Sequence, residues 1–319
     1  MREAVFYNEL IQHACITGVW LEDREFSGQR FVNVDFTDSR FKNCRFKQCH
    51  FIECELSEAS FSYCDFSSAA LSKCKLTGTN FEHSELSNLQ FSECRLLAVD
   101  FAGSRLRNIG FDQCDTQRTD LSDLDISSFI LKETVFHACD FSGCSLKSAS
   151  YSRNDFTDSD FSGSDASNAD FNDCTLYGCD FSGANLSNSS LLKAFAQCAC
   201  FDQVNLSGGT LTESDLRQSS FEGANLANSN FSHTNLVECI FSKIGGKNMM
   251  ISHAILHYAD FSYAQLEYAD FSHSDLQGAS MHGANTERVK WDGANQQNVR
   301  NTDDERLYAE SWLPRKTTG

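Results

Sequence analysis

The most prominent feature of the chain is an apolar residue at every fifth position. From Leu21 to Trp291 this period keeps one phase, and 45 of its 55 positions are Leu or Phe. The exceptions are Thr116, Ile126, Tyr151, Ala166, Ala196, Gly246, Ile251, Met281, Thr286 and Trp291. A helix of 3.6 residues per turn or a strand of period two cannot keep every fifth residue inside. The pattern therefore predicts a repeat architecture whose unit is a pentapeptide.

The residues around each apolar centre narrow this prediction. A small residue stands two positions before the centre, as in Ala184-Asn185-Leu186-Ser187-Asn188. This motif resembles that of the pentapeptide-repeat family over about 85% of the chain. The resemblance implies an all-β solenoid: a right-handed quadrilateral β-helix with four pentapeptides per coil and the central and small residues inside. We expect this β-helix over residues 16–299, between helical caps at residues 1–15 and 300–319.

Given four pentapeptides per coil, residues twenty apart should stack on one side of the rod. With coils about 4.8 Å apart, nearly 14 coils would give a rod on the order of 65 Å long. One stack should consist mostly of phenylalanine, and we expect these rings to fill the narrow interior. Its members are Phe41, Phe61, Phe81, Phe101, Phe141, Phe161, Phe181, Phe201, Phe221, Phe241 and Phe261.

Both ends of such a rod need closing, because open strand edges promote stacking into fibres. Apolar residues at helical spacing between Arg2 and Ala14 predict an N-terminal helical cap. Thr302 followed by acidic residues predicts the start of a C-terminal helix, which Pro314 would end. Its apolar residues are Leu307, Trp312 and Leu313. In some members of the family this region joins two rods, so a cap and a homodimer contact are both open.

The fifteen cysteines fit the repeat rather than a disulfide framework. Twelve occupy the small inward position, where a free thiol packs as a small apolar group. They are Cys44, Cys49, Cys54, Cys64, Cys74, Cys94, Cys114, Cys139, Cys144, Cys174, Cys179 and Cys239. Cys198 and Cys200 lie outside this pattern, which suggests a local bulge and makes Cys198 the most accessible thiol.

Nothing in the sequence indicates catalysis, a cofactor or a membrane anchor. No nucleophile is flanked by a base, and His253 and His257 occupy different positions of their pentapeptides, which argues against a metal site. No stretch approaches the roughly 20 apolar residues of a membrane helix, and the N-terminus lacks the pattern of a signal peptide. We therefore expect a cytoplasmic protein that is not an enzyme.

The charge indicates the kind of partner. The formal net charge is -18, and residues 110–285 hold 23 acidic against 8 basic residues. Phosphate binding relies on Lys and Arg, so direct binding to nucleic acid is not expected, whereas a protein with a basic surface fits. We call Asp100, Asp120, Asp140, Asp160 and Asp180 the Asp ladder, because the predicted register stacks them on one side. Asp before the centre can hydrogen-bond the turn, but Asn does this equally well on another side, at Asn185, Asn205 and Asn225.

Two roles as a protein-binding rod follow from the resemblance and the charge. The first is a scaffold or adaptor, for example in a bacterial secretion system or as an effector, with a local contact patch. Tyr258, Tyr263 and Tyr268 would ring one coil and could form that patch, or cover the C-terminal cap. The second is a DNA mimic that occupies the DNA-binding saddle of gyrase or another topoisomerase, and inhibits it or protects it from quinolones.

Overall fold

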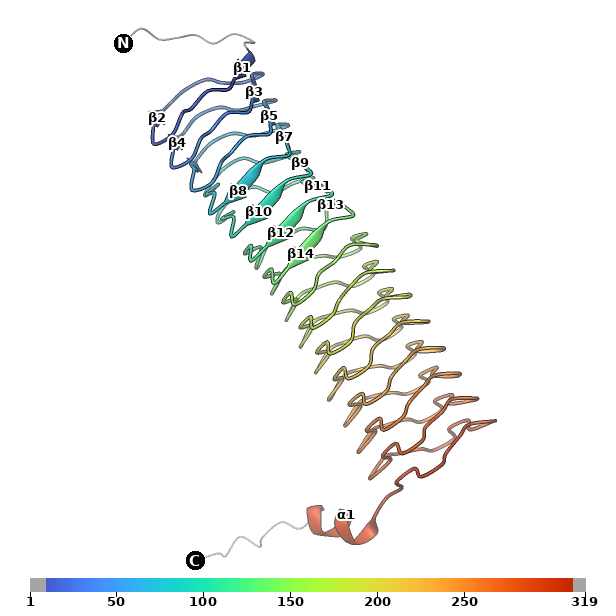
Figure 1. Cartoon of the computed structure of the whole chain (residues 1–319). Helices are drawn as coiled ribbons and strands as arrows, with labels where there is room; N and C mark the ends of the chain where they lie inside the picture. Colours follow the sequence, from blue (N-terminus) through green and yellow to red (C-terminus); the bar gives the residue numbers. More distant parts are fainter. Residues whose placement is uncertain (1–9, 312–319) are drawn as a thin grey trace, which may run out of the picture.

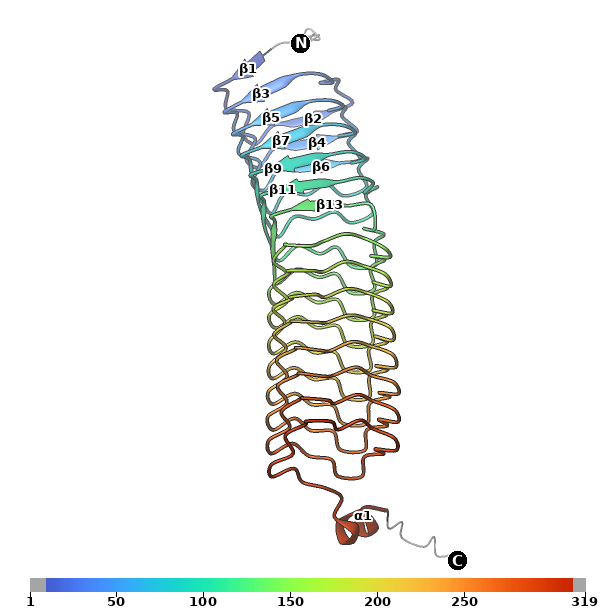
Figure 2. The same ribbon diagram turned by 90° about the vertical axis from the view of Figure 1, so that its right-hand side faces the viewer.

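The structure is a computed structural model that describes residues 10–311, and it forms one long parallel β-solenoid (Figure 1). The first and the last coil lie at opposite ends of the rod, and the coils stack along its length (Figure 2). Within each sheet, neighbouring strands are parallel and twenty residues apart, as Leu10 pairs with Arg30 and Phe111 with Leu131. This register confirms the predicted β-helix with four pentapeptides per coil.

Three sheets run along the sides of the N-terminal coils. The largest contains β1 (Leu10–Gln12), β3 (Arg30–Val32), β5 (His50–Ile52), β7 (Ala70–Ser72), β9 (Gln90–Ser92), β11 (Gly110–Asp112) and β13 (Ile130–Lys132). The second contains β8 (Lys75–Thr77), β10 (Arg95–Leu97), β12 (Asp115–Gln117) and β14 (Val135–His137), and the third β2 (Trp20–Glu22), β4 (Arg40–Lys42) and β6 (Ser60–Ser62). Single bridges continue the twenty-residue register to the pair Ser280 and Arg300.

Each pentapeptide ends in a tight turn at a corner of the rod. At one corner the Ala184 N–H donates to the Phe181 carbonyl at 3.0 Å, and the residue between them in the turn, Gly183, has a positive φ of 65°. A positive φ at the third residue is the mark of a type II turn. Asn188 and Lys193 hold the same position at φ 56° and 57°, so the turn does not demand glycine.

The core is the predicted column of phenylalanines. Phe161 is fully buried, and its ring stacks on Phe141 at 4.7 Å and on Phe181 at 4.8 Å between ring centroids. The same stacking runs from Phe41 to Phe101 and from Phe141 to Phe261, with Leu121 in the gap. The prediction of an inward phenylalanine stack is therefore confirmed.

The twelve cysteines at the small inward position are buried free thiols, as predicted. Burial raises the pKa of the Cys49, Cys139 and Cys239 thiols to about 12. Cys198 is exposed and Cys200 is half-buried, but the bulge predicted beside them is wrong. The Cys198 N–H still donates to the Arg217 carbonyl at 3.0 Å, because the small Ala196 takes the central position without shifting the backbone.

The two ends differ from each other. The N-terminal helical cap is wrong for residues 10–14, because Leu10–Gln12 form strand β1 and the five-residue period continues back through Ile16 to Ile11. Residues 1–9 lie outside the described chain. Helix α1 (Asp304–Ser311) confirms the predicted C-terminal helix, and the Asp303 carboxylate accepts hydrogen bonds from the N–H groups of Glu305 and Arg306 at 3.1 and 3.0 Å. Trp312 and Leu313 lie outside the described residues. Within residues 10–311, no helix has the length and apolar character needed to cross a membrane.

Candidate functional site

The predicted Asp ladder forms an unbroken row of aspartates along one side of the rod. Parallel bridges join Asp100 to Asp120, Asp120 to Asp140, and so on to Asp180. One oxygen of each aspartate, Oδ1, accepts the backbone N–H two residues later, at 2.8, 2.9, 2.8, 2.7 and 2.8 Å from the first to the last. This bond is the turn-stabilising role expected from the sequence.

The second carboxylate oxygen of the ladder has no such role. Asp100 Oδ2 accepts a hydrogen bond from Asn80 at 3.1 Å. Among the described residues, Oδ2 of the other four aspartates accepts no hydrogen bond, and no Lys, Arg or His forms an ion pair with any of the five. A row of four free oxygens therefore faces solvent.

A row of asparagines on another side makes hydrogen bonds between coils that the Asp ladder lacks. We call Asn185, Asn205 and Asn225 the Asn ladder. Each accepts the N–H two residues later, at 3.2 to 3.3 Å, and each amide also donates to the residue one coil earlier, at 3.1 to 3.2 Å. Asparagine thus accepts the same turn hydrogen bond and adds a hydrogen bond between coils. Aspartates in the same arrangement repel one another instead.

The surroundings of the Asp ladder consist mostly of small side chains and carry one sign of charge. We define the acidic face as the outward positions between 100 and 183 on the side of the Asp ladder, over five coils. These positions hold the Asp ladder, Asp123 and no Lys, Arg or His. The remaining outward positions carry only Ala, Ser or Gly. A Cβ atom at Gly163 or Gly183 would meet nothing within 4 Å, so neighbouring atoms do not require glycine there. Sequence reasoning missed this feature, although the recurrence of Gly103, Gly143, Gly163 and Gly183 signalled it.

The three tyrosines ring one coil, as the sequence suggested, and two of them are well exposed. The rings of Tyr258 and Tyr263 lie over Gly278 and Gly283 of the next coil. Tyr268 instead accepts a hydrogen bond from the Arg288 guanidinium, which also lies 5.3 Å from its ring centroid.

The middle tyrosine, Tyr263, belongs to the contact between the rod and α1. Its hydroxyl donates to Glu310, and Glu310 also pairs with the buried His282 at 3.1 Å and with Arg306 at 2.7 Å. Leu307 is the one half-buried residue among 301–310, with its Cδ1 atom 3.6 Å from where a Cβ of Gly283 would stand. Leu307 and Glu310 of helix α1 thus contact one corner of the rod end.

The histidines singled out in the sequence lie in separate surroundings. His253 stacks between His233 and His273, with ring centroids 4.8 and 4.9 Å apart. His257 pairs with Asp275 at 2.9 Å. In the described chain, no three His, Cys, Asp or Glu side chains are grouped so that they could hold a metal ion.

Comparison with known families and structures gives a consistent result. The family model for the pentapeptide repeat region matches residues 64–135, 134–211 and 214–291, and the model for pentapeptide repeats (8 copies) matches residues 30–67 and 39–78. No curated protein matches the chain.

Several solved structures resemble parts or most of the chain. One is Rfr23, a pentapeptide repeat protein from the cyanobacterium Cyanothece 51142, with 25% identity and a TM-score of 0.29; the match covers 30% of this chain and 64% of Rfr23. HetL from the cyanobacterium Nostoc sp. strain PCC 7120, involved in heterocyst differentiation regulation, is 22% identical over 77% of this chain and 86% of its own, with a TM-score of 0.26. QnrB1, a plasmid-mediated fluoroquinolone resistance protein, is 17% identical over 95% and 98%, with a TM-score of 0.20.

Proposed function

Because the chain belongs to the pentapeptide-repeat family, we propose that it is a non-enzymatic rod that acts as a scaffold or adaptor by binding the basic surface of another protein. The observation that carries this proposal is the Asp ladder with its free oxygens. Its charges are neither neutralised by neighbours nor needed for the turn, since Asn serves the turn elsewhere. A row of like charges that the turns do not require is best explained by a partner.

The shape of the acidic face suits a flat basic surface. Lys or Arg side chains of a partner can reach Oδ2 of Asp120, Asp140 and Asp160 while Oδ1 keeps its turn bond. The glycines and serines between the ladder positions leave no long side chain in the way. Complementary charge of this kind mainly raises the rate and the specificity of association.

A pair of matched triple variants tests this proposal. The ladder variant changes Asp120, Asp140 and Asp160 to Asn. The control variant changes Asp155, Asp165 and Asp170 to Asn, on the other three sides of the same part of the rod, where each carboxylate also accepts the N–H two residues later. Both variants lose three charges and keep the turn acceptor.

Partners captured on the immobilised full chain would be quantified by mass spectrometry. We expect basic proteins to fall at least about tenfold on the ladder variant and to persist on the control, and to be released by salt. Equal retention on both variants would refute the acidic face as the binding surface.

DNA mimicry is the second candidate, and the unbroken row of five carboxylates favours it. A net charge of -15 over residues 110–285, on the order of 42 Å of rod, gives one charge per roughly 3 Å, against one per about 1.7 Å in DNA. Supercoiling by purified gyrase, with and without a quinolone, is the direct assay. Inhibition or protection that weakens in the ladder variant supports mimicry, whereas no effect at micromolar concentration rejects it and leaves the scaffold role.

A further inference from the structure

We propose that two copies of this chain associate side by side and antiparallel, through a second surface that adjoins the acidic face. We call it the aromatic face: the outward positions of residues 175–258 on the side that precedes the acidic face in each coil. Its exposed apolar residues are Tyr177, Phe195, Ile255 and Tyr258, with the half-buried Val237 and the exposed thiol of Cys198 among them. This contact goes beyond the binding of a basic partner and is independent of it.

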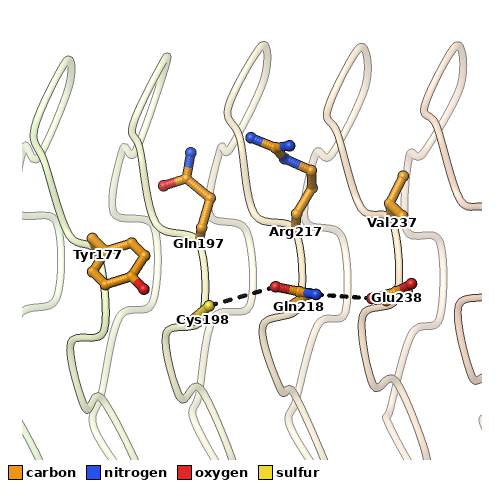
Figure 3. Close-up of a pocket in the computed structure, with 7 residues that line it drawn as sticks. All are labelled: Tyr177, Gln197, Cys198, Arg217, Gln218, Val237 and Glu238. Carbon is orange, nitrogen blue, oxygen red and sulfur yellow. Dashed lines mark hydrogen bonds between the residues drawn. The ribbon is translucent and has the colours of Figure 1, made fainter.

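A trough of about 540 Å³ runs along the aromatic face, parallel to the rod axis (Figure 3). The side chains of Gln197, Arg217 and Val237 form one wall, those of Cys198, Gln218 and Glu238 form the other, and the ring of Tyr177 stands at one end. The polar side chains are engaged along the rod: Gln218 donates to Glu238 at 2.9 Å and faces the Cys198 thiol at 3.7 Å.

Two apolar residues of this face, Phe195 and Ile255, stand where the repeat usually has a polar residue. Phe195 is 52% exposed and Ile255 43% exposed, at the position where other coils place a turn acceptor. One coil after Phe195, Asp215 accepts the Arg217 N–H at 3.4 Å, a bond that a phenylalanine cannot make. Exposed aromatic and aliphatic side chains next to a trough are typical of a protein contact.

The charge of the aromatic face allows a second copy to approach. Between 175 and 258 its outward Asp, Glu, Lys and Arg residues are Asp215, Arg217 and Glu238, a net of -1. The neighbouring coils of the same side that two antiparallel copies would also overlap add Asp155, Asp158 and Asp275, which gives -4, against -6 for the acidic face. Arg217 is held by both oxygens of Asp215, at 2.9 and 2.8 Å, so this pair is neutral. In a protein of net charge -18, two copies therefore meet with less repulsion on this side than on the acidic face.

The order of residues along the rod fits a twofold axis. Phe195 and Ile255 occupy equivalent positions three coils apart, separated by Asp215 and Asn235. An axis midway between them, perpendicular to the rod, places Phe195 against the partner's Ile255, and the reverse. The same operation places Gln218 opposite the partner's Glu238. Most homo-oligomers use such a self-complementary contact.

The length over which the two rods overlap determines the expected affinity of the dimer. With the axis there, about seven coils of each rod face each other, which is roughly 35 Å of length. With a face about 10 Å wide, the dimer buries on the order of 700 Å², less than the roughly 1,200 Å² of stable complexes. We therefore expect reversible association in the micromolar range, strengthened by salt because salt screens the remaining repulsion.

Sedimentation velocity from about 1 to about 100 µM protein, at low and high salt, measures this association. The dimer should grow with concentration and with salt, and Phe195→Ser with Ile255→Ser should weaken it by at least about tenfold. Both side chains are exposed, so circular dichroism should be unchanged. The Asp120, Asp140 and Asp160 ladder variant should dimerise at least as well as the wild type.

Crosslinking tests the arrangement itself. In a Cys15→Ser background, Tyr258→Cys should be joined by a short bismaleimide to Cys198 of the partner subunit, whereas Tyr63→Cys, a matched exposed tyrosine elsewhere on the rod, should not. A chain that stays monomeric at high salt overturns the proposal. So does a dimer that ignores the Phe195 and Ile255 changes but is lost on Leu307→Ser, which would place the contact at α1.

Discussion

Replacing three aspartates of the ladder by asparagine should make the protein more stable, although it removes three native carboxylates. The neutralised positions, Asp120, Asp140 and Asp160, take part in all four neighbour pairs between Asp100 and Asp180. Two unit charges about 5 Å apart repel by roughly 0.8 kcal/mol in bulk water, so the four pairs sum to about 3 kcal/mol at low salt. Near 0.15 M salt, where the Debye length is about 8 Å, about half of this remains.

Two further features of the structure set the sign of this effect. The turn bond survives, because an asparagine Oδ1 accepts the N–H two residues later at 3.2 Å at Asn185 and Asn225. The new amides can also donate to the next coil, as Asn205 does to Asn185 at 3.2 Å. The asparagine turn bond is longer than the 2.7 to 2.9 Å of the three aspartates and offsets part of the gain, whereas the new bonds between coils add to it.

The control variant makes the test specific. Asp155, Asp165 and Asp170 bridge only to uncharged residues one coil before and after them. Their replacement by Asn should change the free energy of unfolding by less than about 1 kcal/mol, within the range of ordinary surface substitutions. Urea unfolding at about 0.02 and 0.5 M salt would be followed by circular dichroism. If the ladder variant gains no more than the control at low salt, the carboxylates do not repel as argued and the case for a partner weakens.

Three other predictions follow from the same structure. Phe161→Ala should destabilise the protein by about 3 to 5 kcal/mol, and Phe195→Ala by less than about 1 kcal/mol at dilute protein, because the first ring is buried and the second faces solvent; equal effects in urea unfolding would contradict the register. A thiol reagent should label Cys198 quickly in the native protein and the twelve inward thiols only after unfolding, and rapid labelling of a dozen thiols would disprove the packing. Hydrogen bonds from Thr37 hold the pKa of Asp35 below its usual value. This carboxylate therefore stabilises the fold above about pH 4 and loses that effect as the pH falls through its folded pKa. Urea midpoints measured from about pH 7 to about pH 2 should accordingly show a smaller loss of stability in acid for Asp35→Asn than for the wild type.

The fold could be predicted because the inward residues and the stacking of coils both follow a fixed period in the sequence. The five-residue period places Phe161 inside, and the four-sided coil brings it onto Phe141 and Phe181. The predicted N-terminal helix is wrong because the segment fits both a helical and a five-residue period. Ile11 suits either, and pairing of β1 with β3 favours the strand. A short apolar segment does not distinguish the two, since tertiary pairing overrides local propensity.

The binding surfaces were predictable only in part. The Asp ladder follows from the period alone, because its members differ by twenty residues. The aromatic face does not, since Phe195 and Ile255 are sixty residues apart and are single departures from the motif. Their meaning depends on exposure and on the neutral Asp215 and Arg217 pair between them, which the register alone does not reveal. The acidic face thus follows from regular positions of the repeat, whereas the aromatic face depends on departures from it.

The two proposed contacts should respond to salt in opposite ways, and this follows from the architecture. In a solenoid each coil contacts only its neighbours, so a change on one side of the rod leaves the backbone on another side in place. Binding of a basic partner to the acidic face rests on attraction and should weaken as salt rises. Association through Phe195 and Ile255 rests on apolar contact against a repulsive net charge of -18, and should strengthen. At low salt the chain would thus present its acidic face as a single rod, and at higher salt it would pair along the aromatic face. A dimer and a basic partner that both dissociate on raising salt would mean that both contacts use the carboxylates, and the separation of the two faces would be wrong.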